Sequence, residues 1–379
     1  MDRNTLGIYV QVPFCQTKCT YCNFHTGVVA RSLYRPYVDA VCREIEESRA
    51  LRGGTVDTVY LGGGTPSLLD PADVARIMDA IRTAYSCVWE EVTLEADPET
   101  ITADKASAWL DAGIDRISMG VQSLNDKELR AAGRMHRRED VYRAMEFLRE
   151  AGFQNVSMDL IAGLPHQTRG SWEASVDELV AMRPEHVSIY LLEVDEGSRL
   201  GRELLAGGKK YGAGRVPSDA EMADFYESAC VKLEARGFEH YEISNWGLPG
   251  RASKHNLKYW RREPYVGFGA GAHSFDGQKR WANVHDPAAF AGAIEQGRSA
   301  RESEEVVTPS QALEEELFLG LRELAGIDLA RIERQYGADL TPRVGKLLEE
   351  GLIEREGDTI RLTPEKLTIS NEAFVELLG

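Results

Sequence analysis

Short runs of β-branched and aliphatic residues recur through the first half of the chain, separated by longer segments with apolar residues at helical spacing. The runs predict six strands, at residues 8–12, 57–61, 91–95, 116–120, 156–160 and 187–191. Helical spacing is clearest at 37–51 and 141–152, and a third helix is predicted at 70–81 with Asp70 as N-cap and Pro71 first. Six strand–helix units in series predict an α/β fold with a parallel sheet and right-handed crossovers.

Polar residues follow the ends of these predicted strands. The first strand leads into a loop with three cysteines, and the second leads into "GGGTP" at 62–66. The other four endings also carry polar groups: Glu95, "GVQ" at 120–122, Asp159 and Glu193. The carboxyl ends of barrel strands meet at one rim, which is where barrel chemistry lies. We therefore expect a partial (β/α)6 barrel rather than a doubly wound sheet.

The pattern changes after about residue 200. Three regions are expected: a partial barrel at 1–215, a barrel extension at 216–305 and a C-terminal module at 306–379. A flexible loop is predicted at 206–214, a helix at 218–236 and one strand at 240–246. The last region has helical patterns and ends in a predicted hairpin at 352–363. It resembles a mostly helical winged-helix module whose acidic helices argue against DNA binding.

Charge and composition exclude several classes of protein. The net charge of −17 argues against a broad phosphate-binding surface, so we expect no nucleic-acid partner. We find no apolar run of membrane-spanning length and no signal-peptide pattern, and we expect a cytoplasmic protein that does not itself span a membrane. Six cysteines in 379 residues do not make a disulfide scaffold. In a reducing compartment, a clustered set indicates metal binding or catalysis.

Half of the cysteines lie in one short segment, "FCQTKCTYCNFHTG" at 14–27. Cys15, Cys19 and Cys22 have the spacing Cys-x3-Cys-x2-Cys. Three thiolates can hold a [4Fe–4S] cluster by three of its irons and leave the fourth iron open to an external ligand. Three unrelated thiols, or a zinc site completed by His25, are the alternatives. The other cysteines are expected to be buried small apolar residues: Cys42, Cys87 and Cys230.

The second strand ends in the glycine-rich segment "GGGTP". Glycines leave backbone amides uncovered, so a carboxylate or an amine could approach the chain closely there. A glycine run by itself is usually only a turn. Its place behind the cysteine loop suggests a ligand-binding segment.

Together these motifs resemble the radical S-adenosylmethionine superfamily. The order and spacing of "Y-x-x-x-P-F-C", "LEADPET", "SMGVQS" and "MDLIAGLPHQT" resemble one subfamily, which holds oxygen-independent coproporphyrinogen III oxidase and the HemW haem chaperones. The resemblance covers nearly the whole chain. It implies a radical-SAM barrel, a [4Fe–4S] cluster on the three cysteines and a pocket for S-adenosylmethionine. Carried over by position, the pocket residues would be Tyr9, Tyr21, Gly63, Gly64, Thr65, Glu95, Gln122, Arg134 and Asp159.

Two departures separate the members of this subfamily. The oxidase pattern has a fourth cysteine two residues after the third, where this chain has Phe24. The oxidase also has a long arm before its first strand, whereas this chain enters the strand at Leu6. Both favour the HemW type, and so does "HNLKYW" at 255–260, which matches the pattern His-Asn-x-x-Tyr-Trp.

The resemblance places haem contact in "HNLKYW". His255 is a candidate axial ligand, and Tyr259 and Trp260 could pack against the porphyrin. The alternative is that His255 is a hydrogen-bonded histidine in a domain contact. Three other histidines lie near motifs and could be pocket residues, although no spacing demands it: His136, His166 and His273.

The expected function is that of a haem chaperone. The resemblance implies that the chain binds haem, the cluster and S-adenosylmethionine and passes haem to an acceptor protein, for which a membrane haem protein is one candidate. The competing hypothesis is a radical oxidase that decarboxylates coproporphyrinogen III, with the cofactor supplying the difficult chemistry. Because of Phe24 and the missing arm, we expect no such oxidase activity.

Overall fold

The computed structural model describes residues 5–48, 50–51 and 53–378. Its centre is one sheet with the strand order β12-β11-β10-β9-β1-β2-β3-β4-β5-β6-β8-β7. Six parallel neighbours in this sheet correspond to the six predicted strands: β1 Thr5–Val12, β2 Thr55–Gly63, β3 Ser86–Ala96, β4 Arg116–Gln122, β5 Val156–Ala162 and β6 His186–Leu191. The prediction of an α/β fold with a parallel sheet is confirmed.

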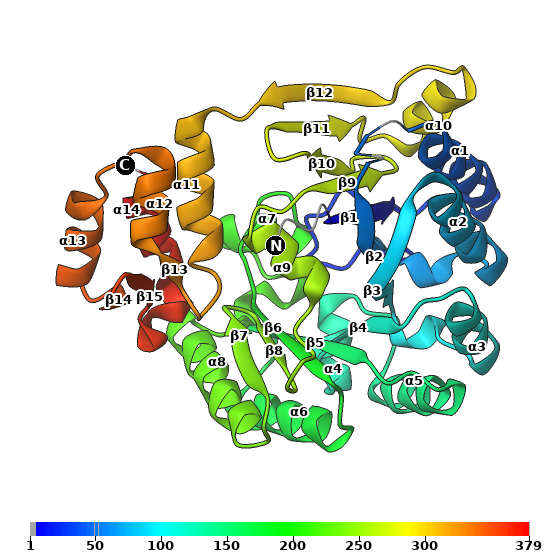
Figure 1. Ribbon diagram of the computed structural model, residues 1–379. Coiled ribbons are helices and arrows are strands. Elements are labelled where there is room, and N and C mark those ends of the chain that lie inside the picture. The colour runs from blue at the N-terminus through cyan, green and yellow to red at the C-terminus, as the bar shows by residue number, and fades with distance from the viewer. Residues whose placement is uncertain (1–4, 49, 52, 379) are drawn as a thin grey trace.

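Helices cover the outer face of this curved sheet (Figure 1). They are α1 Tyr34–Glu47, α2 Pro71–Ala84, α3 Ala103–Asp111, α4 Asp126–Ala132, α5 Arg138–Ala151 and α6 Arg169–Ala181. Asp70 caps α2 as predicted, because its side chain accepts a hydrogen bond from Ala72 N. The helix predicted at 37–51 ends earlier, at Glu47, and residue 49 of that range lies outside the described residues. No helix in the described part of the chain is long and apolar enough to cross a membrane.

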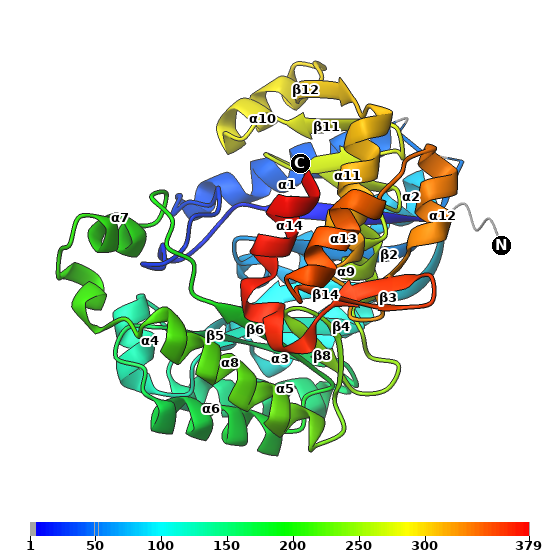
Figure 2. The same cartoon turned by 90° about the vertical axis from the view of Figure 1, so that its left-hand side faces the viewer.

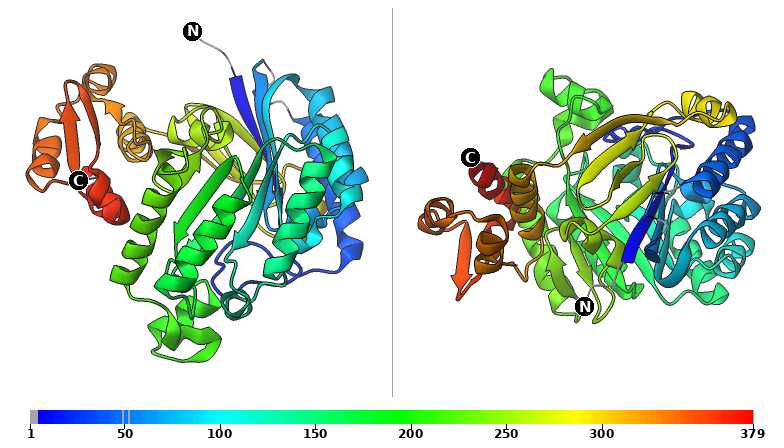
Figure 3. Two further views of the ribbon diagram at one scale, coloured as in Figure 1. Left: turned by 90° about the horizontal axis from the view of Figure 1, so that it is seen from below. Right: turned by 45° about the horizontal axis from the view of Figure 1, so that its top comes forward.

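The two faces of the sheet differ in polarity, as β2 shows. Val59 and Leu61 are fully buried in the hydrophobic core. Thr58 and Tyr60 alternate with them and form hydrogen bonds with polar side chains of other segments. Because successive side chains of a strand point to opposite faces, the concave face of the sheet is polar. A partial barrel with a polar interior results, and Figure 3 shows the fold from below and, in a second view, with its top turned forward.

The region after residue 215 extends both edges of the same sheet. At the edge beside β1 lie β9 Tyr265–Phe268, β10 His273–Phe275, β11 Lys279–Asn283 and β12 Arg301–Val306, with α10 Pro287–Glu295 between the last two. At the edge beside β6 lie β8 Asn245–Gly247 and β7 Glu239–Glu242, preceded by α8 Asp219–Glu234. Helix α9 Lys254–Trp260 connects the two edges.

Two local predictions are wrong. The single strand predicted at 240–246 is a hairpin of β7 and β8, whose turn is held by Glu242, which accepts from Ser244 N at 3.1 Å. The loop predicted at 206–214 follows α7 Arg199–Leu205 and contains a 3-10 segment, Lys210–Arg215. Tyr211 in this segment packs under the Arg199 guanidinium, 5.3 Å from the ring centroid, which gives the segment a fixed position on α7.

The C-terminal module is mostly helical, as predicted. It contains α11 Pro309–Gly320, α12 Leu329–Tyr336, α13 Thr341–Glu349 and α14 Ser370–Leu378, with β13 Ile327–Asp328, β14 Ile353–Glu356 and β15 Thr359–Leu362 in a small antiparallel sheet. Ion pairs attach the module to the end of α9. Arg261 contacts Glu323 at 2.7 Å and Arg262 contacts Glu315 at 3.0 Å. The module therefore rests on α9 (Figure 1).

Candidate functional site

The cysteine loop, which we define as the segment between Pro13 and Gly27, leaves the carboxyl end of β1. Backbone hydrogen bonds close its base: Cys15 N donates to Gly27 O at 3.0 Å, and Gly27 N donates to Pro13 O at 2.9 Å. Phe14 is buried and stacks on Tyr34 of α1, with ring centroids 4.2 Å apart. The base is thus fixed to the barrel, while the three cysteines stay partly exposed.

The tip of the loop is held by neighbouring segments. Thr20 N donates to Ala132 O at 2.9 Å, and the Thr17 hydroxyl donates to Gly133 O at 3.2 Å. Leu200 N of α7 donates to Thr20 O at 2.7 Å. These contacts join the loop to the end of α4 and to α7, and Figure 2 shows the open side of the barrel where they lie.

Burial raises the pKa of the Cys15 and Cys22 thiols. Hydrogen bonding by Thr26, which lies beside both sulfurs, works against that rise. The same hydroxyl oxygen is buried and has no well-aligned partner among the described residues. A donor placed beside two thiols suits a site in which those sulfurs are thiolates bound to metal.

The three cysteines do not form a site for one metal ion. In the described part of the chain, no three side chains of the histidine, cysteine, aspartate and glutamate types are close enough to share one. This geometry disfavours the zinc alternative, and the His25 ring packs instead against His285, with centroids 4.4 Å apart. A cubane cluster offers a separate iron to each thiolate, so it does not need three sulfurs to meet at one point.

In the glycine segment at the end of β2, the backbone amides are already hydrogen-bonded within the protein, which the sequence did not predict. Gly63 N donates to Glu95 Oε2 at 2.9 Å, and Gly64 N and Thr65 N donate to backbone carbonyls leading into the cysteine loop, at 2.8 and 2.7 Å. The expectation that these amides are open to a ligand is wrong. A Cβ at Gly64 would lie 2.5 Å from Phe14 O, so the glycine is needed for the close approach of the two segments.

Glu95 lies on the concave face beside this segment. Its Oε1 accepts a hydrogen bond from the Tyr60 hydroxyl at 2.8 Å. Tyr60 stacks on Tyr9, whose hydroxyl donates to Gln11 Oε1 at 2.7 Å. Burial raises the pKa of Glu95 to about 7, and the hydrogen bonds from Tyr60 and Gly63 work against that rise. Tyr9, Gly63 and Glu95 are therefore brought together as the sequence predicted.

Arg134 connects the glycine segment to the cysteine loop. Its guanidinium donates to Gly120 O at 2.7 Å and to the sulfur of Cys19 at 3.6 Å. It also forms an ion pair with Asp97, and the other oxygen of Asp97 accepts from the Thr65 hydroxyl at 3.1 Å. Asp97 is a site residue that sequence reasoning missed, although it lies within the quoted "LEADPET".

Tyr21, between the second and third cysteines, lies beside this group. It packs on a small apolar cluster that includes Leu200 and Met222. Burial raises the pKa of its phenol well above the usual range, and the neighbouring Cys19 adds to that rise. Tyr21 is thus a neutral aromatic side chain that borders the cysteines.

Two predicted pocket residues have buried oxygen atoms without partners in the described structure. They are Gln122 Oε1 and Asp159 Oδ1. Burial raises the pKa of Asp159 to about 6, against the effect of Ser188 and Ser157. A buried acceptor without a partner costs free energy, so both oxygens suit a bound group that donates hydrogen bonds.

The backbone around Gln122 is also shaped for close approach. Gln122 has a φ of 64°, and a Cβ at Gly120 would lie 2.9 Å from the Gln122 side chain and 3.3 Å from that of Arg134. Gln122 thus has a left-handed backbone and Gly120 is closely packed. Backbone strain of this kind tends to occur at functional sites. The residues present therefore fit a small polar cofactor with hydroxyl and amine donors.

In the "HNLKYW" segment, His255 is a hydrogen-bonded histidine inside the protein, which is the alternative that the sequence left open. His255 is 1% exposed, and its two ring nitrogens lie 2.9 Å from Thr58 Oγ1 and 2.9 Å from the Tyr259 hydroxyl. Trp260 lies under the Arg322 guanidinium, 4.4 Å from the ring centroid. In this arrangement His255 cannot serve as an axial ligand, because its ring is buried and both nitrogens are in use.

The other histidines near motifs have separate surroundings. His136 is buried, and its Nε2 lies 2.9 Å from Val121 O. His166 is partly buried at the end of β5, with a φ of 71°. His273 is exposed on β10. The structure thus brings only His136 into contact with Arg134, at 3.4 Å between Nε and Nδ1.

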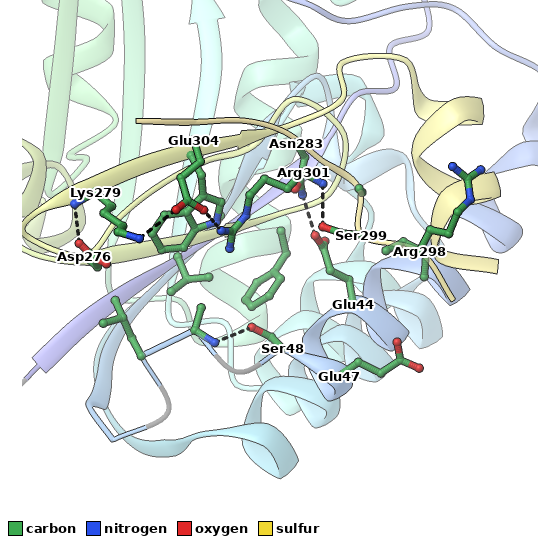
Figure 4. A pocket seen from close by; sticks show the side chains of 18 of the residues that line it. Glu44, Glu47, Ser48, Asp276, Lys279, Asn283, Arg298, Ser299, Arg301 and Glu304 are labelled. Carbon is green, nitrogen blue, oxygen red and sulfur yellow. Dashed lines mark hydrogen bonds and ion pairs between the residues drawn. The ribbon is translucent and has the colours of Figure 1, made fainter. Parts of the chain in front are cut away.

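A cavity of about 460 Å³ lies between the end of α1 and strands β9, β11 and β12 (Figure 4). None of the predicted site residues lines it. Charged residues on its wall are already paired, as Lys279 is with Glu304 at 3.0 Å. Glu44 on its floor accepts from Gly269 N at 2.8 Å and from Asn283 Nδ2 at 2.7 Å, which ties α1 to the segment before β10 and to the end of β11.

Comparisons with known proteins agree with this geometry. Residues 9–179 match the radical SAM superfamily, and residues 307–365 match the HemN C-terminal domain. The chain is 37% identical to the haem chaperone HemW of Bacillus subtilis, with 98% of each chain covered. It is 34% identical to the HemW of Mycobacterium tuberculosis, with 100% of this chain and 96% of that protein covered.

A solved structure shares the fold. Coproporphyrinogen III oxidase (HemN) from Escherichia coli, a radical SAM enzyme, superposes with a TM-score of 0.84. It is 22% identical, and the match covers 98% of this chain and 89% of that one. The radical SAM fold with its C-terminal domain is thereby confirmed, as the sequence predicted.

Proposed function

The chain belongs to the HemW family of the radical SAM superfamily, and from this premise we propose that it is a haem chaperone. It would bind a [4Fe–4S] cluster, S-adenosylmethionine and haem, and it would pass haem to an acceptor protein. The observation that carries the proposal is the likeness to HemW proteins over nearly the full length of both chains.

The residues at the carboxyl ends of the strands support the cofactor part of the proposal. Cys15, Cys19 and Cys22 would hold the cluster by three irons, and Thr26 would donate toward the sulfurs. When bound, the cluster supplies an iron with an open position and an electron for redox chemistry. Arg134 reaches both Cys19 and Gly120, so it would set the distance between cluster and cofactor pocket.

The pocket residues would recognise S-adenosylmethionine by its polar groups. The unpartnered oxygens of Gln122 and Asp159 would accept hydrogen bonds from ribose hydroxyls or from the amine. Because the amides of Gly63, Gly64 and Thr65 already donate within the protein, they would not be the donors to the cofactor. Glu95 would add negative charge beside a cationic cofactor. Tyr9 and Tyr21 would border the pocket and restrict water.

The competing function is coproporphyrinogen III oxidation. The oxidase neighbour is similar at a level that establishes only the fold. In the oxidase pattern, Phe24 of this chain would be a cysteine. Phenylalanine has no thiol and cannot bind iron, so its presence at position 24 supports the chaperone function over the oxidase function.

Two parallel assays test the proposal. Cluster-loaded protein is titrated with haem while the absorption spectrum is recorded, and the same preparation is incubated with reductant, S-adenosylmethionine and coproporphyrinogen III. We expect stoichiometric haem binding and no protoporphyrinogen. Formation of protoporphyrinogen by a protein that binds no haem would show that the chain is an oxidase and not a chaperone.

A further inference from the structure

Seven of the eight histidines of this protein fall into two groups, and the partly buried His166 belongs to neither. Four are buried or, for His240, partly buried, and have a ring nitrogen within hydrogen-bond distance of a protein group: His136, His186, His240 and His255. Three others are exposed, and among the described residues their ring nitrogens form no hydrogen bond: His25, His273 and His285. Exposed histidines scattered over a surface would need no explanation, but these three lie together.

The three rings come from distant parts of the sequence. The rings of His25 and His285 have centroids 4.4 Å apart, with an angle of 38° between their planes. His273 pairs with Ala282 of β11, which stands three residues before His285, so it lies on the same part of the sheet. His25 belongs to the cysteine loop, three residues after Cys22, so the group lies at the mouth of the barrel. We call these three residues the histidine group.

The strands that present two of these histidines are held rigidly. The Tyr37 hydroxyl accepts from Ala270 N at 2.9 Å and donates to Gln11 O at 2.8 Å. Glu44 holds Gly269 and Asn283 from the other side, as described above. Contacts from α1 thus fix the segment just before His273, at Gly269 and Ala270, and Asn283, just before His285. Such positioning is expected of residues that must meet a ligand at a fixed place.

The space for His285 depends on a glycine. Gly271 has a φ of 73°, and a Cβ at this position would lie 2.8 Å from the Nδ1 atom of His285. Any other residue at 271 would therefore be strained and would press on the imidazole. The close packing of backbone and ring keeps His285 directed toward His25.

Exposed apolar side chains adjoin the histidine group. Phe24, immediately before His25, is 67% exposed, and Val28 on the same loop is 61% exposed. A large aromatic side chain left in water beside unpartnered imidazoles suits a ligand that is flat, apolar and carries a metal.

We propose that the histidine group receives haem, with one of its imidazoles as the axial ligand to iron and with Phe24 against the porphyrin face. This inference rests on the proposed haem-binding function and gives that function a site. The rings of His25 and His285 are too close to occupy opposite faces of one porphyrin, so a single imidazole of this pair binds at a time. "HNLKYW" is then a structural segment.

The choice of haem over a free metal ion follows from the number of ligands. No three metal-binding side chains in the described residues can share one ion, so a free cation would find fewer than three such protein ligands here. Haem brings four porphyrin nitrogens of its own and needs only one or two protein ligands. The histidine group can supply that number without rearrangement of the backbone.

Spectroscopy of histidine variants tests the proposal. The full chain, loaded with cluster, is titrated with ferric haem, and absorption and electron paramagnetic resonance spectra are recorded. The variants are His25→Ala, His273→Ala, His285→Ala and all three together. His255→Ala tests the competing ligand. His166→Asn is the matched control, since Asn tolerates the positive φ of that position. Iron and sulfide contents report whether the cysteine loop of each variant is intact.

The expected result is that the triple variant loses the imidazole-ligated spectrum and binds haem at least about tenfold more weakly. Added free imidazole should restore the spectrum, and binding of metal-free protoporphyrin should change little. His255→Ala and His166→Asn should keep the ligated spectrum of the unaltered chain.

Two outcomes overturn the inference in different ways. If the unaltered chain binds haem and the triple variant has the same spectrum, the site is wrong and the chaperone function stands. If the unaltered chain binds no haem, the proposed function fails, and the inference fails with it.

Discussion

The Arg134 guanidinium lies 3.6 Å from the sulfur of Cys19 and 2.7 Å from the carbonyl oxygen of Gly120. One side chain thus touches both the loop that would hold a cluster and the strand end that would hold a cofactor. Its ion pair with Asp97 extends the connection to Thr65. Cluster and cofactor would therefore occupy one continuous site, although the residues that form it are far apart in the sequence.

The first prediction concerns the cluster. Replacing Cys15, Cys19 or Cys22 by Ala should abolish stable cluster binding, because each thiolate would hold its own iron. Replacing Cys42, Cys87 or Cys230 should leave the cluster in place, since these residues are buried or partly buried in helices and strands away from the loop. Iron and sulfide analysis after anaerobic reconstitution measures both sets. A full cluster in Cys19→Ala would show that Cys19 is not a cluster ligand.

The second prediction concerns the cofactor pocket. Asp159→Ala and Glu95→Ala should weaken S-adenosylmethionine binding by about ten- to a hundredfold, since a hydrogen bond to a charged acceptor contributes roughly 1.5–3 kcal/mol. Cluster content should be unchanged. Isothermal titration gives the affinities, and Glu193→Ala, an exposed acidic residue after β6, is the control. Unchanged affinity in both pocket variants would remove them from the site.

The third prediction is a pH dependence. Burial raises the pKa of Glu95 to about 7 and that of Asp159 to about 6. Both carboxyls become protonated as the pH falls through these values, and the site loses negative charge. S-adenosylmethionine carries a sulfonium and an ammonium group, so it should bind the ionised form more tightly. Affinity should rise about tenfold from pH 6 to pH 8, because a group with a pKa of 7 is about one-tenth ionised at pH 6.

Calorimetry in buffers of different ionisation enthalpy tests this sign. Binding at pH 6.5 should release protons, and Glu95→Gln should reduce that release. Proton uptake on binding, or an affinity that falls as the pH rises, would show that the carboxyls do not meet the cationic cofactor in their ionised form.

The fourth prediction concerns His255. Its ring bonds Thr58 and Tyr259 and stacks on Tyr60, with centroids 5.3 Å apart. His255→Ala would leave a cavity and would remove the imidazole partner of the buried Thr58 hydroxyl and of the partly buried Tyr259 hydroxyl. We expect a decrease of about 2–4 kcal/mol in the free energy of unfolding. Denaturant unfolding measures it, and Lys254→Ala, at an exposed position of the same helix, should change stability by less than about 0.5 kcal/mol. Equal stabilities would contradict the structural role.

The sequence was sufficient for the barrel because period-two and helical patterns are local signals. The strands β1–β6 bury one face in the core, and their apolar runs show it. Strand β12 was not predicted, since all six of its residues are exposed and its pairing with β11 depends on tertiary position. The turn between β7 and β8 was missed because Glu242 stabilises it by contacts that no pattern shows.

Only part of the site was predicted from the sequence, for a related reason. Tyr9, Gly63 and Glu95 meet because they stand at strand ends, which a barrel brings to one rim. The uses of the glycine amides and of His255 were not predictable, because their partners come from other strands of the folded chain. The histidine group was missed for the same reason, since only the fold brings His25 beside His285.

The central claim is that this chain carries haem and releases it to another protein. The most direct measurement mixes haem-loaded protein with an apo-haem protein such as apomyoglobin and follows the absorption spectrum of each with time. We predict that bound haem moves to the acceptor in about equimolar amount and that the donor keeps its cluster. A protein that never takes up haem, yet forms protoporphyrinogen from coproporphyrinogen III with reductant and S-adenosylmethionine, would contradict the account.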